Sequence, residues 1–297
     1  MEYTLAVDIG GTKIAAGVMD QKKSWVTTLQ LQSDKSSATS MYESVLQCMN
    51  DVINKAGIRK EQINHIGITI PGQLDIETGL AIYQNNLPWR NFPLGELLRA
   101  KFSQSNIIFE HDVVAAAQGE WTVRNLTNEL FVYVTISTGI SASIIYQGIP
   151  LRGKGFAGEI GFFQMDKGKE LEKSASGSAM EKELKLIEQS LSLPYAFKEW
   201  NKGNEQLNSF FNDKAGQIAR AIYNITATLD PHKIVLGGGV INHQNHFFEL
   251  IKDHFYFLCR QPFQHDWGNR VERSILQGKA GLFGVASGCH NKRRVDV

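Results

Sequence analysis

The order of the apolar segments predicts an α/β fold made of two copies of one unit. Three apolar runs at residues 4–7, 14–19 and 25–31 precede alternating helical and strand patterns. A doubly wound sheet would instead alternate strands and helices from its start. The same order begins again at about residue 129. The sequence therefore predicts two related α/β domains.

The elements of the first copy follow from local patterns. The first two runs flank a glycine-bearing turn, and a polar loop at residues 21–24 precedes the third. Apolar residues at helical spacing predict a helix over residues 41–56, with Gly57 as its C-cap. Further strands are predicted at residues 65–70 and 107–110.

The second copy repeats these patterns. Strands are predicted at residues 129–137, 141–146 and 149–151, a helix at 215–228 and another strand at 233–236. Residues 201–208 are polar and are predicted to form a loop, and a last helix is expected from residue 281 onward.

The strand and helix order β-β-β-α-β-α-β matches the actin-like, ribonuclease-H-like ATPase domain. Two such copies predict a nucleotide site in the cleft between the domains. The expected first domain comprises residues 1–114 with 281–297, the second comprises residues 115–280, and the hinge lies near residues 113–120.

Composition narrows the class of protein. The 297 residues carry 31 basic and 30 acidic side chains, which excludes a nucleic-acid surface built on bulk charge. Three cysteines far apart in sequence indicate reduced thiols. With no secretory signal and no apolar run of roughly 20 residues, we expect a cytoplasmic protein without a membrane partner.

The first glycine-bearing turn contains the best candidate for phosphate binding. It lies behind the first strand and reads Asp8, Ile9, Gly10, Gly11, Thr12, Lys13. Adjacent glycines let backbone N–H groups approach a ligand, while Thr12 and Lys13 add a hydroxyl and a positive charge. Asp8 could hold Mg²⁺. The alternative is a simple hairpin turn.

Two further turns have the same character. Thr138 and Gly139 follow a strand and form a candidate second phosphate loop. Gly237, Gly238 and Gly239 follow another strand and would let a purine and ribose lie on the backbone. Each turn could instead be purely structural, but three of them behind strands together predict a nucleotide site.

The chain resembles the ROK family of repressors, open reading frames and sugar kinases over nearly its full length. The matching stretches are residues 8–13, 67–72, 86–89, 110–120, 155–161 and 234–240. The resemblance implies an ATP-dependent kinase that transfers the γ-phosphoryl group to a sugar hydroxyl, usually the 6-hydroxyl of a hexose. ATP and Mg²⁺ are the implied cofactors, and dimers are common among relatives, so we expect a homodimer.

The resemblance also implies roles for individual residues. Asp112 occupies the position of the catalytic base, although by itself it could be a helix N-cap. Asp8 would then help to place Mg²⁺. The implied sugar ligands are Asn86, His111, Asp112, Glu159 and Glu172. Glu172 alone could also be a solvated helix charge, and Trp89 is expected in the core rather than against the sugar.

The chain departs from the family pattern at three places. Phe162 stands where many members have a histidine that binds zinc and sugar, and no cysteine lies between residues 163 and 171. We therefore expect no zinc site. His111 replaces a usual asparagine, and residues 141–143 read Ser-Ala-Ser where relatives often have glycines.

Phe162 bears on the choice of sugar. Phe162 and Phe163 offer an apolar face against which the second ring of a β-glucoside could stack, so β-glucosides such as cellobiose are the leading candidates. Glucose and N-acetylmannosamine are the alternatives. The rival classes are a non-catalytic sugar-sensing regulator, for which the seven residues before Asp8 leave no DNA-binding segment, and a filament-forming actin relative.

Overall fold

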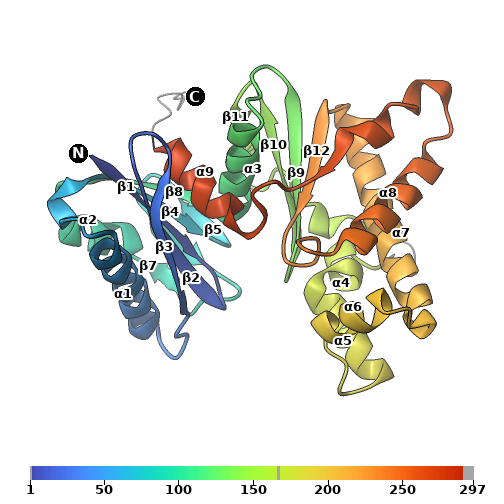
Figure 1. Ribbon diagram of the computed structural model, residues 1–297, viewed down its shortest axis with the longest axis horizontal. Coiled ribbons are helices and arrows are strands. Elements are labelled where there is room, and N and C mark those ends of the chain that lie inside the picture. Colours follow the sequence, from blue (N-terminus) through green and yellow to red (C-terminus); the bar gives the residue numbers. More distant parts are fainter. Residues whose placement is uncertain (1, 166–167, 290–297) are drawn as a thin grey trace. The chain divides into compact units, whose positions relative to one another are not determined.

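Two five-stranded sheets organise the chain, each in its own unit (Figure 1). The computed structural model describes residues 2–165 and 168–289. The first unit comprises Met1–Asn125 and Lys279–Val297, and the second comprises Leu126–Gly278. The predicted α/β class is confirmed, and each unit is described by itself below.

The first unit contains both sheet strands and flanking helices in the predicted order. Its main-sheet strands are β1 (Tyr3–Ile9), β2 (Lys13–Met19), β3 (Trp25–Gln32), β4 (Ile63–Ile70) and β8 (Asn106–His111). Its helices are α1 (Ala38–Ala56), α2 (Leu94–Lys101), α3 (Asp112–Val123) and α9 (Ala280–Gly288). Gly57 caps α1 in the left-handed conformation, as predicted.

The second unit has the same kinds of element. Its strands are β9 (Leu130–Ile136), β10 (Ile140–Tyr146), β11 (Ile149–Pro150), β12 (Lys233–Gly237) and β13 (Val271–Arg273). Its helices are α4 (Leu171–Ala175), α5 (Gly177–Ile187), α6 (Leu193–Asn201), α7 (Asn208–Leu229) and α8 (Asn245–Leu258).

The two sheets have one topology. The strand order is β3-β2-β1-β4-β8 in the first and β11-β10-β9-β12-β13 in the second. In both, the first three strands in sequence pair antiparallel, and the last two join in parallel. The predicted recurrence of one unit is therefore confirmed at the level of strand pairing.

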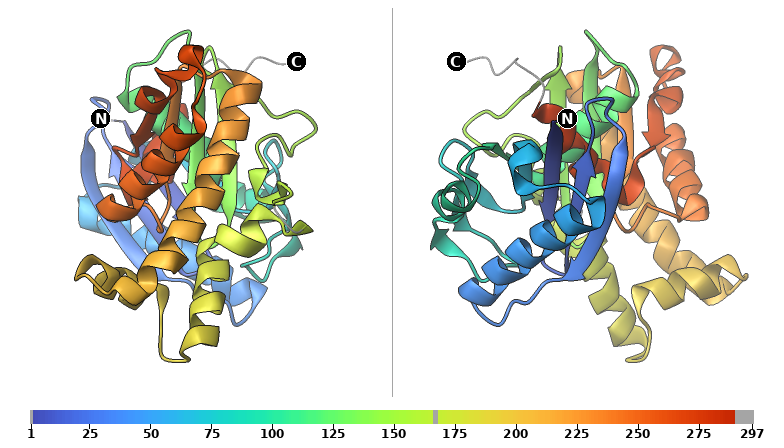
Figure 2. Two further views of the ribbon diagram at one scale, coloured as in Figure 1. Left: turned by 90° about the vertical axis from the view of Figure 1, so that its right-hand side faces the viewer. Right: turned by 60° about the vertical axis from the view of Figure 1, so that its left-hand side comes forward.

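In the first unit, the pleat of β1 decides which helix each side chain meets. Leu5, Val7 and Ile9 belong to the core cluster that contains the buried residues of α1. Ala6 belongs to a separate cluster with Leu282 and neighbouring residues of α9. Because successive strand residues point to opposite faces, α1 and α9 cover opposite faces of this sheet, as Figure 2 shows. Asp8 shares the face of Ala6.

In the second unit, helices bury one face of the sheet. Val132, Val134 and Ile136 of β9 pack in one core cluster with buried residues of α5, α6, α7 and α8. Figures 1 and 2 both show α7 running beside α8. An aromatic group stiffens this core, with Phe211 stacked between Phe197 and Trp200 at centroid distances of 4.6 and 4.5 Å.

The contacts place the boundary between the units after Asn125, whereas the sequence-based division ends the first domain at residue 114. The difference is α3, which packs along α9 in the first unit. A Cβ atom at Gly284 of α9 would lie only 1.6 Å from the carbonyl oxygen of Ala115, so the two backbones touch. This packing joins α3 to the unit that also contains β1.

Two parts of the fold differ from the sequence-based expectation. A small sheet of β5 (Gln73–Asp75), β6 (Leu80–Tyr83) and β7 (Arg90–Phe92) was not predicted. The loop predicted at residues 201–208 is wrong in part: Asn201 ends α6, a short 3-10 helix covers Glu205–Leu207, and Asn208 begins α7. Polar residues on the exposed side of helices explain this error.

The α3–α9 contact gives the first prediction. Gly284→Ala should lower the free energy of unfolding by about 1–3 kcal/mol, because the added methyl group has no space against Ala115. Urea unfolding followed by circular dichroism would measure the change. Gly278→Ala is the matched control, since a Cβ atom there meets nothing within 4 Å. Equal stability of the two variants would contradict this packing argument.

Candidate active site

Asp8 is a half-buried residue at the carboxyl end of β1, and its carboxyl group is largely shielded from water. The register of the parallel pair β1–β4 places Thr69 opposite Asp8. The Thr69 hydroxyl donates a 2.7 Å hydrogen bond to Asp8 Oδ1, and Thr69 itself is fully buried. Burial raises the pKa of Asp8, while the Thr69 hydrogen bond and the positive charge of Lys13 oppose that rise. A cation bound at this carboxylate would offset the free-energy cost of removing the charged group from water.

The turn that follows β1 is held by its own backbone and by Ser33. The Gly10 N–H donates to the Lys13 carbonyl at 3.0 Å. Ser33 donates its N–H to the Thr12 carbonyl at 3.1 Å and its hydroxyl to the Gly10 carbonyl at 2.7 Å. The side chains of Thr12 and Lys13 are exposed. The turn therefore keeps its shape while both polar side chains stay available.

A positive φ angle is not the reason for the glycines at positions 10 and 11. Neither residue has the left-handed backbone. Gly11 is instead required by a close approach: a Cβ atom there would lie 2.8 Å from Asn86 Cβ and 2.9 Å from the Asn86 carbonyl oxygen. The structure thus brings the predicted sugar ligand Asn86 against the predicted phosphate turn.

The loop that carries Asn86 is held by Arg90. One guanidinium nitrogen of Arg90 donates to the carbonyls of Gln84, Leu87 and Trp89 at 2.8, 3.1 and 2.5 Å. Trp89 is fully buried and stacks on Phe92, so the prediction that it is a core residue is confirmed.

His111 and Asp112 lie where β8 passes into α3. Asp112 is the first residue of the helix, and its Oδ1 accepts a 2.9 Å hydrogen bond from the Val113 N–H. His111 is the N-cap residue but makes no side-chain cap. The start of α9 comes close to both acidic residues: a Cβ atom at Gly281 would lie 3.4 Å from Asp8 Oδ2 and 3.8 Å from the Asp112 carbonyl oxygen. Asp8, near the end of β1, and Asp112, directly after the parallel strand β8, therefore both lie close to the start of α9.

In the second unit, the turn at residues 137–139 lies against the start of α5 and against Glu172. The carbonyls of Ser137 and Thr138 accept hydrogen bonds from the first two N–H groups of α5, at 2.7 and 3.3 Å. Glu172 Oε2 accepts a 2.9 Å hydrogen bond from the Ile140 N–H. A Cβ atom at Gly139 would come within 2.5 Å of the same oxygen. One predicted sugar ligand therefore shares its carboxylate with the second predicted phosphate turn.

Glu159 is near Glu172. Ser141 donates a 3.4 Å hydrogen bond to Glu159 Oε1. Burial raises the pKa of Glu159, the Ser141 hydrogen bond lowers it, and the negative charge of Glu172 raises it further. The side chain of Phe162, three residues on, is 64% exposed, and that of Phe156 is 59% exposed. Two carboxylates and two exposed aromatic rings thus come from one short segment.

The turn of three glycines ends β12. Gly238 has a φ of 92°, and a Cβ atom there would lie 2.3 Å from the Ile136 carbonyl oxygen. At Gly237 a Cβ atom would meet the Tyr133 hydroxyl at 2.2 Å. Only Gly239 leaves open space, with nothing within 4 Å. Packing on β9 explains the first two glycines, and Gly239 presents bare backbone.

Sequence reasoning missed several residues that build these sites. Thr69 had a visible signal, since it is a hydroxyl residue within the apolar strand β4. Ser33, Arg90 and Gly281 had no local signal, because their partners are distant in sequence. Among residues 2–165 and 168–289, no group of three or more His, Cys, Asp or Glu side chains is arranged to hold a metal ion.

The strand topology and these turns can now be compared with known proteins. The model of the ROK family matches residues 4–292. The chain belongs to the ROK family. The predicted resemblance is therefore confirmed over nearly the whole chain.

Three relatives are each 26% identical to this ROK protein. The N-acetyl-D-glucosamine kinase of Salmonella newport is 26% identical over 309 residues, covering 94% of this chain and 96% of that protein. The glucokinase of Halalkalibacterium halodurans is 26% identical over 281 residues, covering 85% of each. The crystal structure of the ROK hexokinase from Thermus thermophilus superposes with a TM-score of 0.76 at 26% identity, covering 96% of each chain.

The likeness to a solved ROK kinase over nearly the full chain confirms the predicted actin-like, ribonuclease-H-like fold of this ROK protein. In the part of the chain that the structure describes, no helix combines the length and the apolar character needed to cross a bilayer.

The buried Asp8 of this ROK protein gives the second prediction. Because folding raises the pKa of Asp8, its contribution to stability is present below the unfolded pKa and is lost as pH rises through the folded pKa. Asp8→Asn should therefore raise the free energy of unfolding by about 1 kcal/mol at pH 7 without nucleotide or metal, and by less near pH 4. The variant should lose turnover. Thermal unfolding at the two pH values measures the first effect.

Asp34→Asn is the control, because the pKa of Asp34 is shifted in the opposite direction from that of Asp8. Hydrogen bonds from Ser36 lower the pKa of the exposed Asp34 carboxyl, so removing its charge should not raise stability at pH 7. A stability of Asp8→Asn that is unchanged or lower at pH 7 would show that the carboxylate is not held at a desolvation cost.

Proposed function

We propose that this protein is a ROK sugar kinase that transfers the γ-phosphoryl group of ATP to the 6-hydroxyl of a hexose unit. The observation that carries the proposal is in the first unit. The carboxylates of Asp8, at the end of β1, and Asp112, directly after β8, lie at the carboxyl ends of strands of one sheet, and the turn after β1 has an exposed lysine. The relatives named N-acetyl-D-glucosamine kinase, glucokinase and hexokinase support a hexose as the acceptor.

Residues of the first unit would handle phosphate and metal. Asp8 would hold Mg²⁺, directly or through water, since a buried carboxylate beside a phosphate turn suits a hard cation. The bound Mg²⁺ would neutralise charge on the phosphate oxygens. The backbone of Gly10 and Gly11, the hydroxyl of Thr12 and the ammonium group of Lys13 would bind those oxygens as well.

Asp112 would act as the general base. A sugar hydroxyl is a weak nucleophile, so Asp112 would accept its proton as the new O–P bond forms and the bond to the leaving ADP oxygen breaks. The hydrogen bond from the Val113 N–H holds the carboxylate oriented at the start of α3. His111 and Asn86 would bind neighbouring sugar hydroxyls.

Residues of the second unit would complete both functions. Thr138 and Gly139 would bind phosphate oxygens, and the turn of Gly237, Gly238 and Gly239, whose backbone is exposed at Gly239, would take the purine and ribose. Glu159 and Glu172 would accept hydrogen bonds from the sugar. The raised pKa of Glu159 fits this role, because hydroxyl donors stabilise the ionised carboxylate once the sugar is bound.

The proposed chemistry uses ATP and Mg²⁺ and no zinc. Phe162 stands where a zinc-binding histidine would be expected, and no cysteine lies between residues 163 and 171, of which 166 and 167 lie outside the described residues. A homodimer in the cytoplasm stays a prediction.

Asp112→Asn gives the third prediction. Turnover should fall by roughly 10²–10⁴-fold, because the amide cannot accept the hydroxyl proton. The sugar dissociation constant should change little, since the amide keeps hydrogen-bonding capacity. Coupled ADP release and calorimetric sugar titration measure the two effects.

Asp253→Asn, the same change at an exposed position on α8, is the matched control and should keep full turnover. If Asp112→Asn retains wild-type turnover, Asp112 is not the base. If the wild type binds sugar without any turnover, the rival interpretation as a sugar-sensing regulator is favoured.

A β-glucoside is the leading candidate for the substrate. The exposed rings of Phe156 and Phe162 come from the same segment as Glu159 and offer apolar surface to a second ring or aglycone. Phe163, which was predicted to share this face, instead packs against the core of the second unit. A histidine at position 162 would instead offer a polar contact. Glucose and N-acetylmannosamine are the alternative substrates, and the glucokinase among the relatives favours glucose.

Phe162→Ala gives the fourth prediction. The KM for cellobiose or an aryl β-glucoside should rise about 2–12-fold, since one aromatic contact is worth about 0.5–1.5 kcal/mol. The KM for glucose should change much less. Phe263→Ala, which removes a ring of similar exposure, is the control. Brisk phosphorylation of glucose or an N-acetylhexosamine with no turnover of any β-glucoside would exclude this substrate class.

A further inference from the structure

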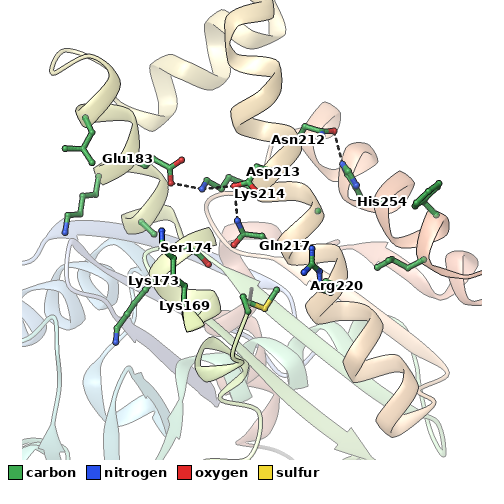
Figure 3. A pocket seen from close by; sticks show the side chains of 17 residues that line it. Lys169, Lys173, Ser174, Glu183, Asn212, Asp213, Lys214, Gln217, Arg220 and His254 are labelled. Atoms are coloured by element: carbon green, nitrogen blue, oxygen red, sulfur yellow. Dashed lines mark hydrogen bonds and ion pairs between the residues drawn. The ribbon is translucent and has the colours of Figure 1, made fainter. Parts of the chain in front are cut away.

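A polar cavity lies in the second unit (Figure 3). It is lined by residues of α4, α5, α7 and α8 and by Met165 and Lys169, which precede α4. Its volume is about 790 Å³, which is in the range of pockets for small molecules. None of its described lining residues belongs to the nucleotide or sugar sites proposed above. The function proposed for this protein therefore leaves the cavity unassigned.

Positive charge gathers in this cavity. Its lining contains five cationic side chains against two carboxylates; the five are Lys169, Lys173, Lys182, Lys214 and Arg220. Lys173 is paired with a carboxylate outside the lining, that of Glu170 at 2.9 Å. The whole chain, in contrast, has a formal net charge of only +1. Such a local excess favours an anionic ligand.

Lys214 is a buried cation of the cavity and contacts both of its carboxylates. Its side chain is only 3% exposed, and its ammonium group donates to Glu183 at 2.6 Å and lies 3.1 Å from Asp213. Figure 3 shows these contacts joining α5 to α7. An ammonium group has three donors, and the described residues provide acceptors for two. Both carboxylates of the cavity are thus engaged by Lys214, and one of its donors is left for a ligand.

Gln217 adds an acceptor beside Lys214. Its Nε2 donates a 2.9 Å hydrogen bond to Asp213, which fixes the orientation of the amide. Its Oε1 is buried and has no hydrogen-bond partner within the described part of the chain. A buried acceptor without a donor is costly, so a ligand hydroxyl would satisfy it.

The rim of the cavity is apolar. Leu186 is 81% exposed and Phe257 is 68% exposed, and both line the opening. On the α8 side, His254 shares a 2.9 Å hydrogen bond with Asn212. A ligand with a ring could contact this rim while its charged group reaches the lysines.

We propose that this cavity binds a phosphate monoester of a small polyhydroxy compound, such as a hexose phosphate. The phosphate group is held by Lys214, Lys182 and Lys169, and a hydroxyl group of the ligand donates to Gln217 Oε1. Charge-assisted hydrogen bonds to phosphate provide most of the affinity.

Helix α4 carries residues of both the cavity and the proposed sugar site. Glu172 of α4 binds the Ile140 N–H, while the next two residues, Lys173 and Ser174, line the cavity. The Ser174 hydroxyl is held by the carbonyls of Glu170 and Leu171, at 3.1 and 3.2 Å. A ligand that shifts this short helix would therefore also shift Glu172.

The test is calorimetric titration of the full-length protein at low ionic strength, without nucleotide. Glucose 6-phosphate, inorganic phosphate and glucose are the three probes. We expect saturable binding of glucose 6-phosphate, weaker binding of phosphate, and loss of about tenfold or more in glucose 6-phosphate affinity in Lys182→Glu. Lys185→Glu, on the same helix but outside this cavity, is the matched control and should stay within about twofold of the wild type.

A second variant, Lys214→Met, should also lose the binding of glucose 6-phosphate. If Lys214→Met does not fold, because Lys214 is buried, the result with Lys182→Glu is the test. Lys13→Ala separates this site from the proposed phosphate turn, because it should leave the affinity in the cavity unchanged. Equal affinity in the wild type and Lys182→Glu would overturn the proposal, as would no saturable binding at millimolar concentrations. A dimer in solution that covers the rim and abolishes binding would overturn it as well.

Discussion

The burial of a charged group, the Asp8 carboxylate, is the constraint around which the first unit is built. The pleat of β1 directs Asp8 to the face covered by α9, where a carboxylate has little water. Strand register then brings the Thr69 hydroxyl opposite it, and Gly281 at the start of α9 leaves the space that a side chain would occupy. The same parallel strands carry His111 and Asp112 to this end of the sheet. One desolvated carboxylate is therefore matched by a hydroxyl on the neighbouring strand and by a glycine on the helix that covers it.

In the second unit, one carboxylate acts on both the proposed phosphate turn and a second proposed sugar ligand. Glu172 satisfies the backbone N–H of Ile140 beside the turn at residues 137–139, and its charge also acts on Glu159. A group proposed to recognise sugar is thus fixed by the backbone of a turn proposed to bind phosphate. Because Gly139 has no side chain, the carboxylate can lie directly on that turn. The geometry of one ligand set is in this way tied to the geometry of the other.

The sequence was sufficient for most strands of the two main sheets and for their recurrence, because these depend on local periodicity. The roles of the candidate residues, which rest on motifs behind strands, stay predictions. It was insufficient wherever a partner is distant in the chain. Gly11 could be recognised as part of a turn, but only the fold shows that Asn86 is what it accommodates. The helix α3 was assigned to the other domain because its apolar face does not reveal which neighbour it packs on. The small sheet of β5, β6 and β7 was missed because its strands are only three or four residues long.

The contact between Gly11 and Asn86 has a consequence for how this protein could evolve. Arg90 holds the loop of Asn86 through three backbone carbonyls, which ties the conformations of its residues to one another. Because its backbone rests on the turn after β1, any change that resizes this loop also disturbs that turn. Selection for a new acceptor at this loop would therefore act on donor handling at the same time. New specificity is more easily gained at exposed positions such as Phe162, which can vary without repacking the backbone beneath them.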